Sequence, residues 1–594
     1  MQEVTSPFDP TRLLGGVCEV TPGLVKVTAP AAANSGGKML YGLPLGTGQV
    51  GEFVVIQTGL NGVLGRVTRV ALSEKERLSA EPSLSQSDDL HPVALVQLLA
   101  TLDLTKPELV RGIAQYPRLG DRVYSAPPSL VRWVAECSAG ATATDAITIE
   151  LGWVARERSV VVKATPERLF GRHCAILGTT GGGKSYTLAR IVEQSAKHHC
   201  KIIVLDATGE YEFDEKVTKR LALGRVDRAR ELGGFELVSM PHRHLTIPDL
   251  FAIFQPSGKV QGPTLRRAIT SLKLVDLEPT LKRFVQAGVL VKADSERKPF
   301  EDAQSNHAKA LQIPSSEFDI LSLGRQILAE CVFETTKFKP GYFGEEDKNN
   351  ATYCISLVNR IEGLVHAAEL ACVFKPGTLP SLTDRLTEFF SEDSPHRILH
   401  LSLRDLAFDF NAREVVANAI GRYLLHQARE DRFRAANQPV IVFLDEAHHF
   451  LNKSIGDEDS RVDLNAFELI AKEGRKYWLT LCLATQQPRD LPNGVLSQVG
   501  TLIVHRLIND RDREVVERAC GEIDRAAAAF LPTLGPGEAA LVGVDFSIPL
   551  TVQMDEPAKK PNSRGPAFQE AWKGGSKGTR GRDSLISTSD DRAG

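Results

Sequence analysis

Compact apolar runs and amphipathic segments alternate in two parts of this 594-residue chain, from about residue 169 to 244 and from 396 to 507. Each run has five to seven mostly apolar residues, and periodic segments such as SYTLARIVEQSAKH (185–198) follow them. Apolar strands that alternate with helices are typical of a parallel sheet covered on both faces. We therefore predict an α/β fold. The runs are HCAIL (173–177), KIIVLDA (201–207), FELVSM (235–240), RILHLSL (397–403), VIVFLD (440–445), LTLCLAT (479–485) and TLIVHRL (501–507).

The first 155 residues have a different pattern, with short alternating runs such as GGVCEVTPGLVKVTAP and GEFVVIQTG between Gly, Asn and Pro turns. This pattern predicts a small antiparallel β-barrel. The alternative is an irregular extension of the following domain. Residues 73–91 are polar and form either a loop or a short helix.

Residues 245–395 show helical periodicity and few strand signals, so we predict a helical insertion within a single α/β domain. The last part of the chain is rich in Gly, Ser and basic residues, with seven Lys or Arg and one Glu between Lys559 and Arg582. It is either a disordered tail or an arm that touches nucleic acid or a partner. The expected divisions are a barrel (1–155), the first part of the core (156–244), the insertion (245–395), the second part of the core (396–556) and the tail (557–594).

Composition limits the binding partners, the state of the cysteines and the location that we expect for the protein. The net charge of −3 and pI of 6.6 carry no global signature of nucleic-acid binding, so any polyanion contact would come from local basic surfaces. The nine cysteines are scattered without a C-x-x-C pair, which favours reduced thiols over disulfides or a zinc site. There is no basic leader before an apolar core, and no apolar run approaches the roughly 20 residues of a membrane span. We expect a soluble cytoplasmic protein.

The segment GTTGGGKS after the first apolar run matches the phosphate-binding P-loop pattern and precedes a predicted helix. Glycines allow successive backbone N–H groups to face the phosphates, and the helix N-terminus adds its positive dipole end. Lys184 would reach the β- and γ-phosphates of ATP, and Ser185 would ligate Mg²⁺. The fold is therefore expected to have a RecA-like P-loop NTPase core. The predicted nucleotide-binding residues are Gly178, Thr179, Thr180, Gly181, Gly182, Gly183, Lys184, Ser185 and Tyr186.

A P-loop requires an acidic group on a neighbouring strand, and VIVFLDE supplies two. Asp445, at the end of the run, can hold Mg²⁺, and Glu446 can polarise the attacking water as a general base. The following run ends in Gln486 and Gln487. Their amides can sense the γ-phosphate and the water, or they can simply begin a loop.

Phosphoryl transfer gains from a cation placed on the developing charge, so arginines are also candidates. Arg172 precedes the P-loop strand, Arg475 lies in KEGRKYW beside Lys476, and Arg506 follows LIVH. At least one could act as an arginine finger across a subunit interface, although any single one can be structural. Two further acidic residues, Asp206 and Glu210 in DATGEYEF, follow the second run at the same edge of the sheet.

The letters DEAHHF (445–450) invite two other interpretations. A DEAH-box helicase would need an S-A-T element and a late arginine motif, and neither is present. A metal site is disfavoured because adjacent helical side chains diverge, so that His448 and His449 would not share a face. We expect the two histidines to pack or to sense phosphate.

Taken in order, GTTGGGKS, LDATGEY, FLDEAHHF, KEGRKYW, ATQQP, HRLINDRD and LPTLGPGEAALVG resemble the HerA family in the FtsK/HerA group of P-loop NTPases. The resemblance implies an N-terminal HAS-barrel, a homohexamer that hydrolyses ATP with Mg²⁺ between subunits, and movement of double-stranded DNA. It implies catalytic roles for Lys184 and Glu446, sensing by Gln486 or Gln487, action of Arg172 on the neighbouring subunit, and proximity of Arg475 to the active site. Residues 290–350 have no family feature that anchors them.

The resemblance also implies partners. Family members commonly work with a separately encoded NurA-like nuclease, and bacterial members pair with Sir2-type NAD hydrolases or other nucleases in antiphage systems. The leading hypothesis is a DNA-translocating ATPase. The alternative is a ring scaffold whose ATPase regulates a bound effector. A secretion or conjugation coupling ATPase is weakened by the missing membrane segment. Residues 216–234 and LNKSIGDEDSRVDLN (451–465) could line a channel or be solvated faces.

Overall fold

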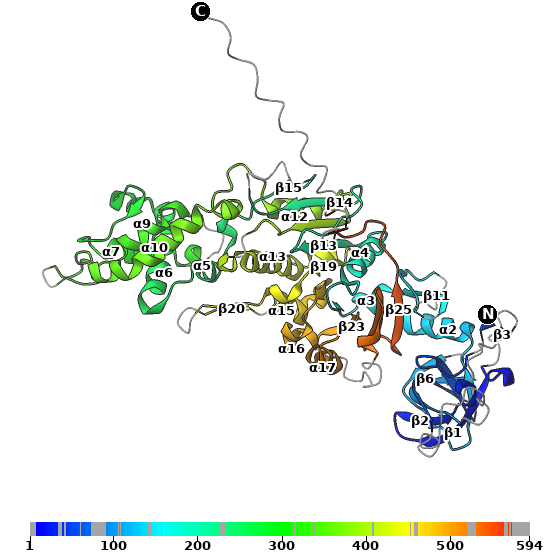
Figure 1. The fold of residues 1–594 in the computed structure, drawn as a ribbon. Helices are drawn as coiled ribbons and strands as arrows, with labels where there is room; N and C mark the ends of the chain where they lie inside the picture. Colours follow the sequence, from blue (N-terminus) through cyan, green and yellow to red (C-terminus); the bar gives the residue numbers. More distant parts are fainter. Residues whose placement is uncertain are drawn as a thin grey trace, which may run out of the picture.

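The computed structural model shows an elongated molecule with a β-barrel at one end, a large sheet in the middle and a helical arm at the other end (Figure 1). It describes residues 7–572 except 34–38, 41–42, 45, 60, 73–90, 105, 107, 141–144, 156, 226–232, 313–316, 337–338, 407–408, 452, 457–460, 520–529, 563–567 and 570–571. The polar segment predicted at 73–91 and most of the basic tail therefore lie outside the described residues.

Six antiparallel strands close the N-terminal barrel in the order β2-β1-β9-β5-β6-β7, and β7 pairs back to β2. A further strand, β8, pairs with the second half of β7, beyond the residues of β7 that pair with β2. Inward side chains such as Val25, Val54 and Val96 form one apolar core. The strands are β1 (Leu13–Val20), β2 (Leu24–Thr28), β5 (Phe53–Thr58), β6 (Asn61–Ala71), β7 (Val93–Asp103), β8 (Glu108–Arg111) and β9 (Arg122–Ser125).

The central sheet has twelve strands in the order β11-β10-β25-β24-β23-β12-β22-β19-β13-β18-β14-β15. The eight strands from β23 to β15 run parallel, and the other four are antiparallel. The parallel strands are β12 (His173–Leu177), β13 (Lys201–Asp206), β14 (Thr218–Ala222), β15 (Glu236–Leu237), β18 (Ile398–Ser402), β19 (Val440–Leu444), β22 (Leu479–Thr485) and β23 (Val499–Val504). The antiparallel strands are β10 (Ile149–Val154), β11 (Glu157–Ala164), β24 (Glu538–Gly543) and β25 (Leu550–Met554).

Alternate residues of each parallel strand enter different cores, as the two-residue period of a strand requires. Ile176 and Val204 pack in the core that contains the helix α4 (Lys184–Ser195). Leu177 and Leu205 pack in the other core, with α13 (Ala412–Arg429) and α15 (Ala466–Glu473). The predicted α/β fold with a parallel-sheet core and an N-terminal barrel is confirmed.

Helices dominate the chain between β15 and β18 and build the arm at the left of Figure 1. The long helices α6 and α10 carry the segments whose periodicity predicted them, and both pack against α9. The α-helices are α5 (Ile247–Phe254), α6 (Gly258–Leu277), α7 (Lys298–Asn306), α8 (Ala308–Gln312), α9 (Leu323–Ala329), α10 (Lys348–Val365), α11 (Ala371–Phe374) and α12 (Leu382–Phe389).

Two local features differ from the sequence-based expectation. The expected boundary at residue 155 falls in the hairpin of β10 and β11, and both strands pair in the large sheet. Between the barrel and this hairpin lies α2 (Pro128–Ala139). Part of the segment 216–234, considered as a channel lining, forms β14, whose Leu221 and Ala222 are buried in the sheet. Among the described residues, no helix is long and apolar enough to cross a lipid bilayer.

Gly152 lies in β10 where this strand pairs with β25, the last strand in chain order. Its φ is +158°, and a Cβ there would lie 2.0 Å from the carbonyl oxygen of Gln553. We expect Gly152→Ala to lower the free energy of unfolding of the core by about 2–3 kcal/mol, because the backbone of β25 must move to make room. Denaturant titration measures this. The matched control is Gly23→Ala, since nothing lies within 4 Å of a Cβ at Gly23. Equal stability of the two variants would contradict the steric argument.

Candidate active site

The P-loop connects β12 to α4 at the carboxyl edge of the parallel sheet. Gly181 and Gly183 have φ of +75° and +113°, which favour glycine. A Cβ on Gly183 would approach Gly537 to 3.1 Å and the His505 ring to 3.2 Å, so the loop also has no room for a side chain there. The loop therefore delivers backbone N–H groups and the start of a twelve-residue helix to one point, which is a site for an anion.

A cavity of about 540 Å³ opens at this point. P-loop residues Thr179 to Tyr186, except Gly182, form one side of it together with Glu210 and Gln486. The opposite side was not predicted from the sequence and comes from the C-terminal strands: Pro536, Gly537, Gln553, Met554, Asp555 and Glu556. Gly537 N–H donates to the carbonyl of Gly182 at 3.2 Å, so this wall is fixed directly to the P-loop.

Lys184 lies between the two acidic residues that end β19. Its Nζ is 2.9 Å from Glu446 Oε1 and 3.6 Å from Asp445 Oδ1, and all three side chains are buried. Glu446 has φ +48°, a left-handed conformation that is uncommon for a non-glycine residue. Strained backbone of this kind clusters at functional sites. The structure thus brings the predicted cation and both predicted carboxylates together.

Three buried carboxylate oxygens at this edge have no hydrogen-bond partner among the described residues: Asp445 Oδ1, Glu446 Oε2 and Glu210 Oε2. Burial raises the pKa of Asp445 to about 7, against the lowering effect of Lys184. Burial also opposes ionisation of Glu446, but Lys184 and the hydrogen bond from Gln486 outweigh it and lower its pKa. Hard, unsatisfied oxygen donors beside a P-loop serine fit Mg²⁺ well. Glu210, expected at this edge of the sheet from its place after the second apolar run, belongs to this acidic set.

Gln486 connects the acidic pair to the P-loop. The Thr180 hydroxyl donates to Gln486 Oε1, and Gln486 Nε2 donates to Glu446 Oε1. Gln487 differs: its backbone N–H donates to Thr485 Oγ1 at 3.1 Å, and its side chain makes no hydrogen bond recorded among the described residues. Of the two candidate sensors, only Gln486 is in contact with the proposed base.

The expectation that His448 and His449 diverge is wrong. Their ring centroids are 4.1 Å apart, because they lie in a short 3-10 turn that follows the left-handed Glu446. His448 Nδ1 is 3.0 Å from Thr485 Oγ1 and 3.4 Å from Glu446 Oε2. His448 therefore packs behind the base, between two strand ends. The described residues contain no group of three His, Cys, Asp or Glu arranged to hold a metal.

The turn after β13 positions Asp445 from the other side. Asp206 is fully buried, and its carboxylate accepts from the backbone N–H groups of Thr208 and Gly209 and lies 2.9 Å from His400 Nε2. The Thr208 hydroxyl then reaches Asp445 Oδ2 at 3.4 Å. His400 and Thr208 were not predicted as functional, although a histidine inside the apolar run RILHLSL was the available signal.

His505 packs against the glycines of the P-loop, and it was not among the residues predicted from the sequence. It is fully buried, and its Nδ1 lies 2.9 Å from the carbonyl of Glu538. Since a carbonyl only accepts, Nδ1 carries the proton and Nε2 accepts from Thr187 Oγ1 at 2.9 Å. Burial lowers the pKa of His505 to about 4, so it stays neutral beneath Lys184. A charged group at this position would repel the lysine that the site needs.

The arginines are divided between the two edges of the sheet. Arg506 lies beside the P-loop, and its carbonyl accepts from the N–H and hydroxyl of Thr179 at 3.1 Å. Arg172 directly precedes β12, and Arg475 lies four residues before β22. β12 and β22 are parallel neighbours, so these two exposed arginines are at the opposite edge, about 16 Å along the strand from the P-loop. Neither reaches the site of its own chain.

The chain after β25 lies across α4. Asp555 pairs with Arg190 at 3.0 Å, and Ala558 N–H donates to Glu193 Oε2 at 2.7 Å. Asn562 N–H then donates to the carbonyl of Glu210 at 2.8 Å. This C-terminal segment (555–562) ends beside the acidic edge of the cavity.

Two family descriptions match the chain: "Helicase HerA, central domain" over residues 149–320, and "Helicase HerA-like C-terminal" over residues 433–563. The first match contains the P-loop, and the second contains Asp445, Glu446 and Gln486. The chain belongs to the HerA family. With the P-loop cavity and the acidic pair in place, this HerA-family protein is an ATPase.

Relatives of known name support this assignment. The chain is 24% identical over 428 residues to the "Probable DNA double-strand break repair helicase HerA" of Methanocaldococcus jannaschii, covering 69% of this chain and 76% of the relative. It is also 24% identical over 477 residues to the "DNA double-strand break repair helicase HerA" of Pyrococcus furiosus, covering 80% and 78%.

Among solved structures, the conjugative coupling protein TrwB bound to the ATP analogue ADPNP is 15% identical, with a TM-score of 0.41, and the match covers 73% of this chain and 94% of TrwB. VirB4 of Thermoanaerobacter pseudethanolicus is 16% identical, with a TM-score of 0.39, and covers 69% and 97%.

The raised pKa of Asp445 gives a test of the acidic site. With a pKa of about 7, roughly half of the Asp445 carboxyls hold a proton at pH 7, and a bound Mg²⁺ expels it. We expect binding of Mg²⁺·ADP at pH 7 to release about half a proton per site, and Asp445→Asn to release none. Calorimetry in two buffers of different ionisation enthalpy, such as PIPES and Tris, measures the release. The exposed Asp490→Asn is the matched control and should release as the wild type does. Identical binding enthalpies in both buffers for the wild type would refute the assignment.

Proposed function

We propose that the protein is a cytoplasmic hexameric ATPase that moves double-stranded DNA through its ring and works with a separately encoded nuclease or other effector. The observation that carries the proposal is the chain of contacts Thr180–Gln486–Glu446–Lys184, which links the P-loop to a buried general base. Relatives named as DNA double-strand break repair helicases support the choice of DNA as the object that is moved.

In this proposal each group at the edge of the sheet has one task. The backbone N–H groups of the loop and Lys184 bind the phosphates of ATP. Ser185 and Asp445 would hold Mg²⁺, which neutralises phosphate charge when it is bound. Glu446 accepts a proton from the attacking water, and Gln486 orients that water or contacts the γ-phosphate. Thr179 and Thr180 shape the loop, and Tyr186 lines the cavity beside it.

Lys184 Nζ donates to Glu446 Oε1 at 2.9 Å, and it cannot bind phosphates and keep that contact unchanged. Binding of ATP is therefore expected to draw the lysine toward the phosphates and to leave the Glu446 carboxylate available to a water. Gln486, which bonds both Thr180 and Glu446, can then contact the γ-phosphate. In this proposal, binding of ATP is coupled to activation of the base.

The hexamer is proposed from the position of Arg172 and Arg475. Both are exposed at the sheet edge opposite the P-loop, so they can act only on another subunit's nucleotide. Arg475 lies close enough to the buried His173 to help burial lower its pKa to about 4. His173 in turn bonds Ala471 and Leu481, which ties both arginine-bearing segments to the sheet. In a closed ring this edge would face the next P-loop.

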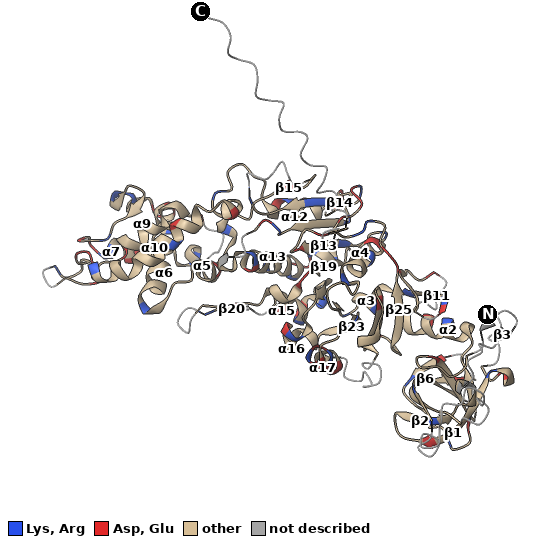
Figure 2. Ribbon diagram, viewed as in Figure 1, with Lys and Arg blue, Asp and Glu red and all other residues tan. Residues whose placement is uncertain are grey.

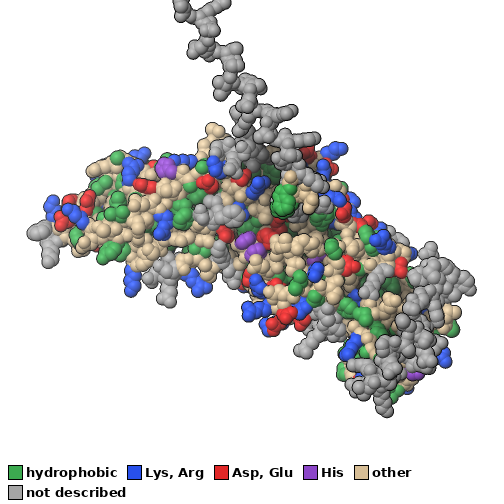
Figure 3. Space-filling model, viewed as in Figure 1, with side chains coloured by type: hydrophobic (Ala, Val, Ile, Leu, Met, Phe, Trp, Pro, Cys, Tyr) green, Lys and Arg blue, Asp and Glu red, His purple; other side chains and the backbone are tan. Residues whose placement is uncertain are grey.

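The alternative is a ring scaffold whose ATPase regulates an effector, such as a Sir2-type NAD hydrolase or a nuclease in an antiphage system, with DNA pumping secondary. The net charge of −3 and the mixture of basic and acidic residues along the elements in Figure 2 leave room for it. On the face in Figure 3, hydrophobic side chains lie in small separate groups, so the view offers no broad apolar surface for a partner.

The first test measures ATP hydrolysis by the full chain with and without linear double-stranded DNA. We expect DNA to stimulate turnover, and Glu446→Gln to reduce kcat about 10²- to 10⁴-fold while nucleotide binding persists, because only the general base is lost. Movement is followed separately by displacement of a DNA-bound protein roadblock. If DNA stimulates neither the ring alone nor the ring with its genomic-neighbour protein, the translocase proposal fails. Persistent turnover in Glu446→Gln would remove Glu446 as the base.

The second test asks whether Arg172 acts on a neighbour. Arg172→Ala and Lys184→Ala should each lack ATPase activity. Rings assembled from a mixture should regain part of it, because a Lys184→Ala subunit supplies its intact Arg172 to the intact P-loop of an Arg172→Ala subunit. The matched control replaces Arg172→Ala by Glu446→Ala, which removes a group from the same edge as Lys184. Mixtures that stay inactive would show that Arg172 does not act in trans.

A further inference from the structure

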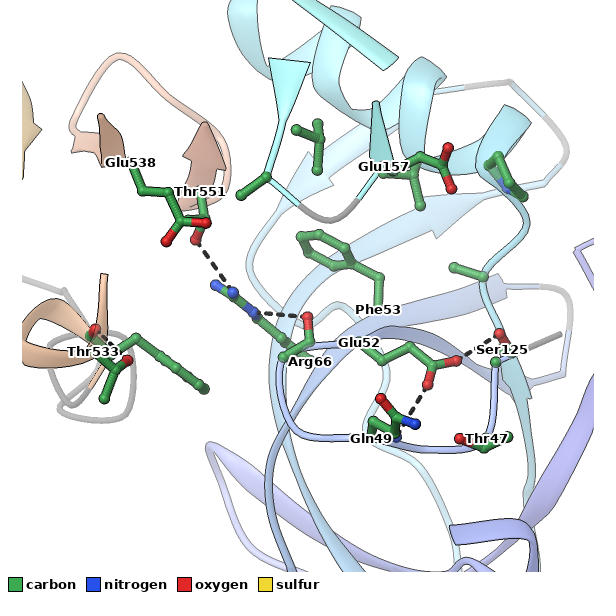
Figure 4. A pocket seen from close by; sticks show the side chains of 18 of the residues that line it. Thr47, Gln49, Glu52, Phe53, Arg66, Ser125, Glu157, Thr533, Glu538 and Thr551 are labelled. Carbon is green, nitrogen blue, oxygen red and sulfur yellow. Dashed lines mark hydrogen bonds between the residues drawn. The ribbon is translucent and has the colours of Figure 1, made fainter. Parts of the chain in front are cut away.

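A second cavity, of about 470 Å³, lies between the barrel and the ATPase core (Figure 4). The barrel contributes Phe53 and Arg66, α2 contributes Val131, and the end of the core contributes Phe530 and Thr551. None of these residues lines the nucleotide cavity. The pocket is comparable in volume to the nucleotide cavity, so it can hold a molecule of metabolite size.

Arg66 forms the centre of one wall. Its guanidinium lies 4.7 Å from the centroid of the Phe530 ring and 5.7 Å from that of Phe53. It donates to the carbonyl of Gly51 and to Thr551 Oγ1, both at 3.2 Å. Figure 4 shows the side chain reaching from the barrel toward Thr551, so this residue joins the two parts of the molecule across the pocket. Its hydrogen bonds are used within the protein.

The carboxylates around the pocket are also satisfied internally. Glu52 accepts from the Ser125 hydroxyl at 2.7 Å and from the N–H groups of Gly48 and Gln49. Glu538 accepts from Gly535 N–H at 2.7 Å, and Glu157 accepts from the Ser159 hydroxyl at 2.6 Å. Each of these three carboxylates therefore accepts at least one hydrogen bond from within the protein.

Arg12 is different. The residue is only 8% exposed and lines the pocket, yet its guanidinium has no ion pair or hydrogen bond with any described residue. Hydrogen bonds from the hydroxyl and N–H of Thr11 lower the pKa of Asp9, three residues away, and the charge of Arg12 contributes least. Because the five guanidinium donors of Arg12 face the pocket and have no acceptor among the described residues, an acceptor from outside the chain fits them.

We propose that this junction pocket is a binding site for a small organic anion, whose carboxylate or phosphate group pairs with Arg12 and whose apolar part lies against Val131, Val154 and Leu534. A guanidinium binds either kind of anion with two parallel hydrogen bonds. The apolar residues supply about half of the remaining lining and favour a ligand with a hydrocarbon portion over a bare inorganic ion.

The pocket shares a wall with the nucleotide cavity. Gly537 and Gln553 line the nucleotide cavity, and Glu538 and Thr551, on the same two strand segments, line the junction pocket. The carbonyl of Glu538 bonds His505, which in turn bonds Thr187 of α4. An anion that fixes the junction would therefore fix β24 and β25 against the P-loop. This coupling rests on the proposed ATPase role of the cavity, whereas binding to the junction pocket does not.

The experiment uses the full chain with Lys184→Ala, so that phosphate does not bind at the P-loop. Succinate and inorganic phosphate are the two probes, and thermal melting and calorimetry are the readouts. We expect saturable stabilisation by both probes, stronger for succinate because its hydrocarbon portion can lie against the apolar lining. Adding Arg12→Met should weaken binding about 10- to 100-fold, because a charge-assisted bond is lost. The exposed Arg118→Gln in the same barrel is the matched control and should change nothing.

Two further measurements keep the proposal open to refutation. Without ligand, Arg12→Met should melt at the same temperature as its parent or higher, because it removes a buried charge that has no partner. Val131→Trp fills the pocket from α2 while Arg12 keeps its own side chain, and should also abolish the stabilisation. The proposal is overturned if neither probe stabilises the parent, if both variants bind as the parent does, or if Arg12→Met melts well below its parent. In the protein with intact Lys184, succinate should shift the KM for ATP; an unchanged KM would refute the coupling between the two pockets.

Discussion

The arrangement of the active-site residues depends on balancing the charges of side chains that are buried together. Three carboxylates and one lysine meet at the carboxyl edge of a parallel sheet, where solvent cannot screen them. Lys184 compensates Glu446 and partly compensates Asp445, and burial raises the pKa of Asp445 to about 7. Triphosphate and Mg²⁺ bring four negative charges and two positive ones, so the whole arrangement must be redistributed. Hydrogen bonds from Thr208 to Asp445 and from Gln486 to Glu446 keep these two carboxylates in place during that redistribution, and His400 holds Asp206, which in turn bonds Thr208.

The C-terminal strands give this site a connection that a P-loop fold does not require. Gly537 is bonded to Gly182, and the next residue bonds the neutral His505 beneath the loop. The same strands contact the barrel through Thr551 and Arg66. A displacement of the barrel would therefore reach the phosphate site through two short strands. The links of this path are the hydrogen bonds from Arg66 to Thr551, between β24 and β25, and from Gly537 to Gly182.

The sequence predicted the fold where local signals and tertiary environment agree. All seven apolar runs lie in or overlap strands of the sheet, because a strand buried on both faces has no reason to carry polar residues. β14 was missed because TKRLA carries two basic residues, which is possible near the end of the sheet. The hairpin of β10 and β11 has the alternating pattern of the barrel strands, and sequence pattern alone does not say which sheet a half-buried strand joins.

The active-site residues could likewise be predicted only where the sequence carries a local signal. The P-loop and the Asp-Glu pair are contiguous motifs with a chemical reason for each residue, so they could be recognised in the sequence alone. His400, His505 and Gly537 act through contacts between distant segments, and a single buried histidine gives only a weak signal in a sequence. The close approach of the His448 and His449 rings was not predicted, because a regular helix was assumed where a left-handed residue precedes a tight turn.

The C-terminal segment has a practical consequence for anyone who handles this protein. Residues 555–562 lie along α4 and end with Asn562 bonded to Glu210, within the acidic edge of the nucleotide cavity. A purification tag or fluorophore attached directly at Asn562 would therefore start beside Glu210, which lines the nucleotide cavity. Labels on the barrel avoid this interference, and a dye at position 562 becomes instead a reporter of nucleotide occupancy.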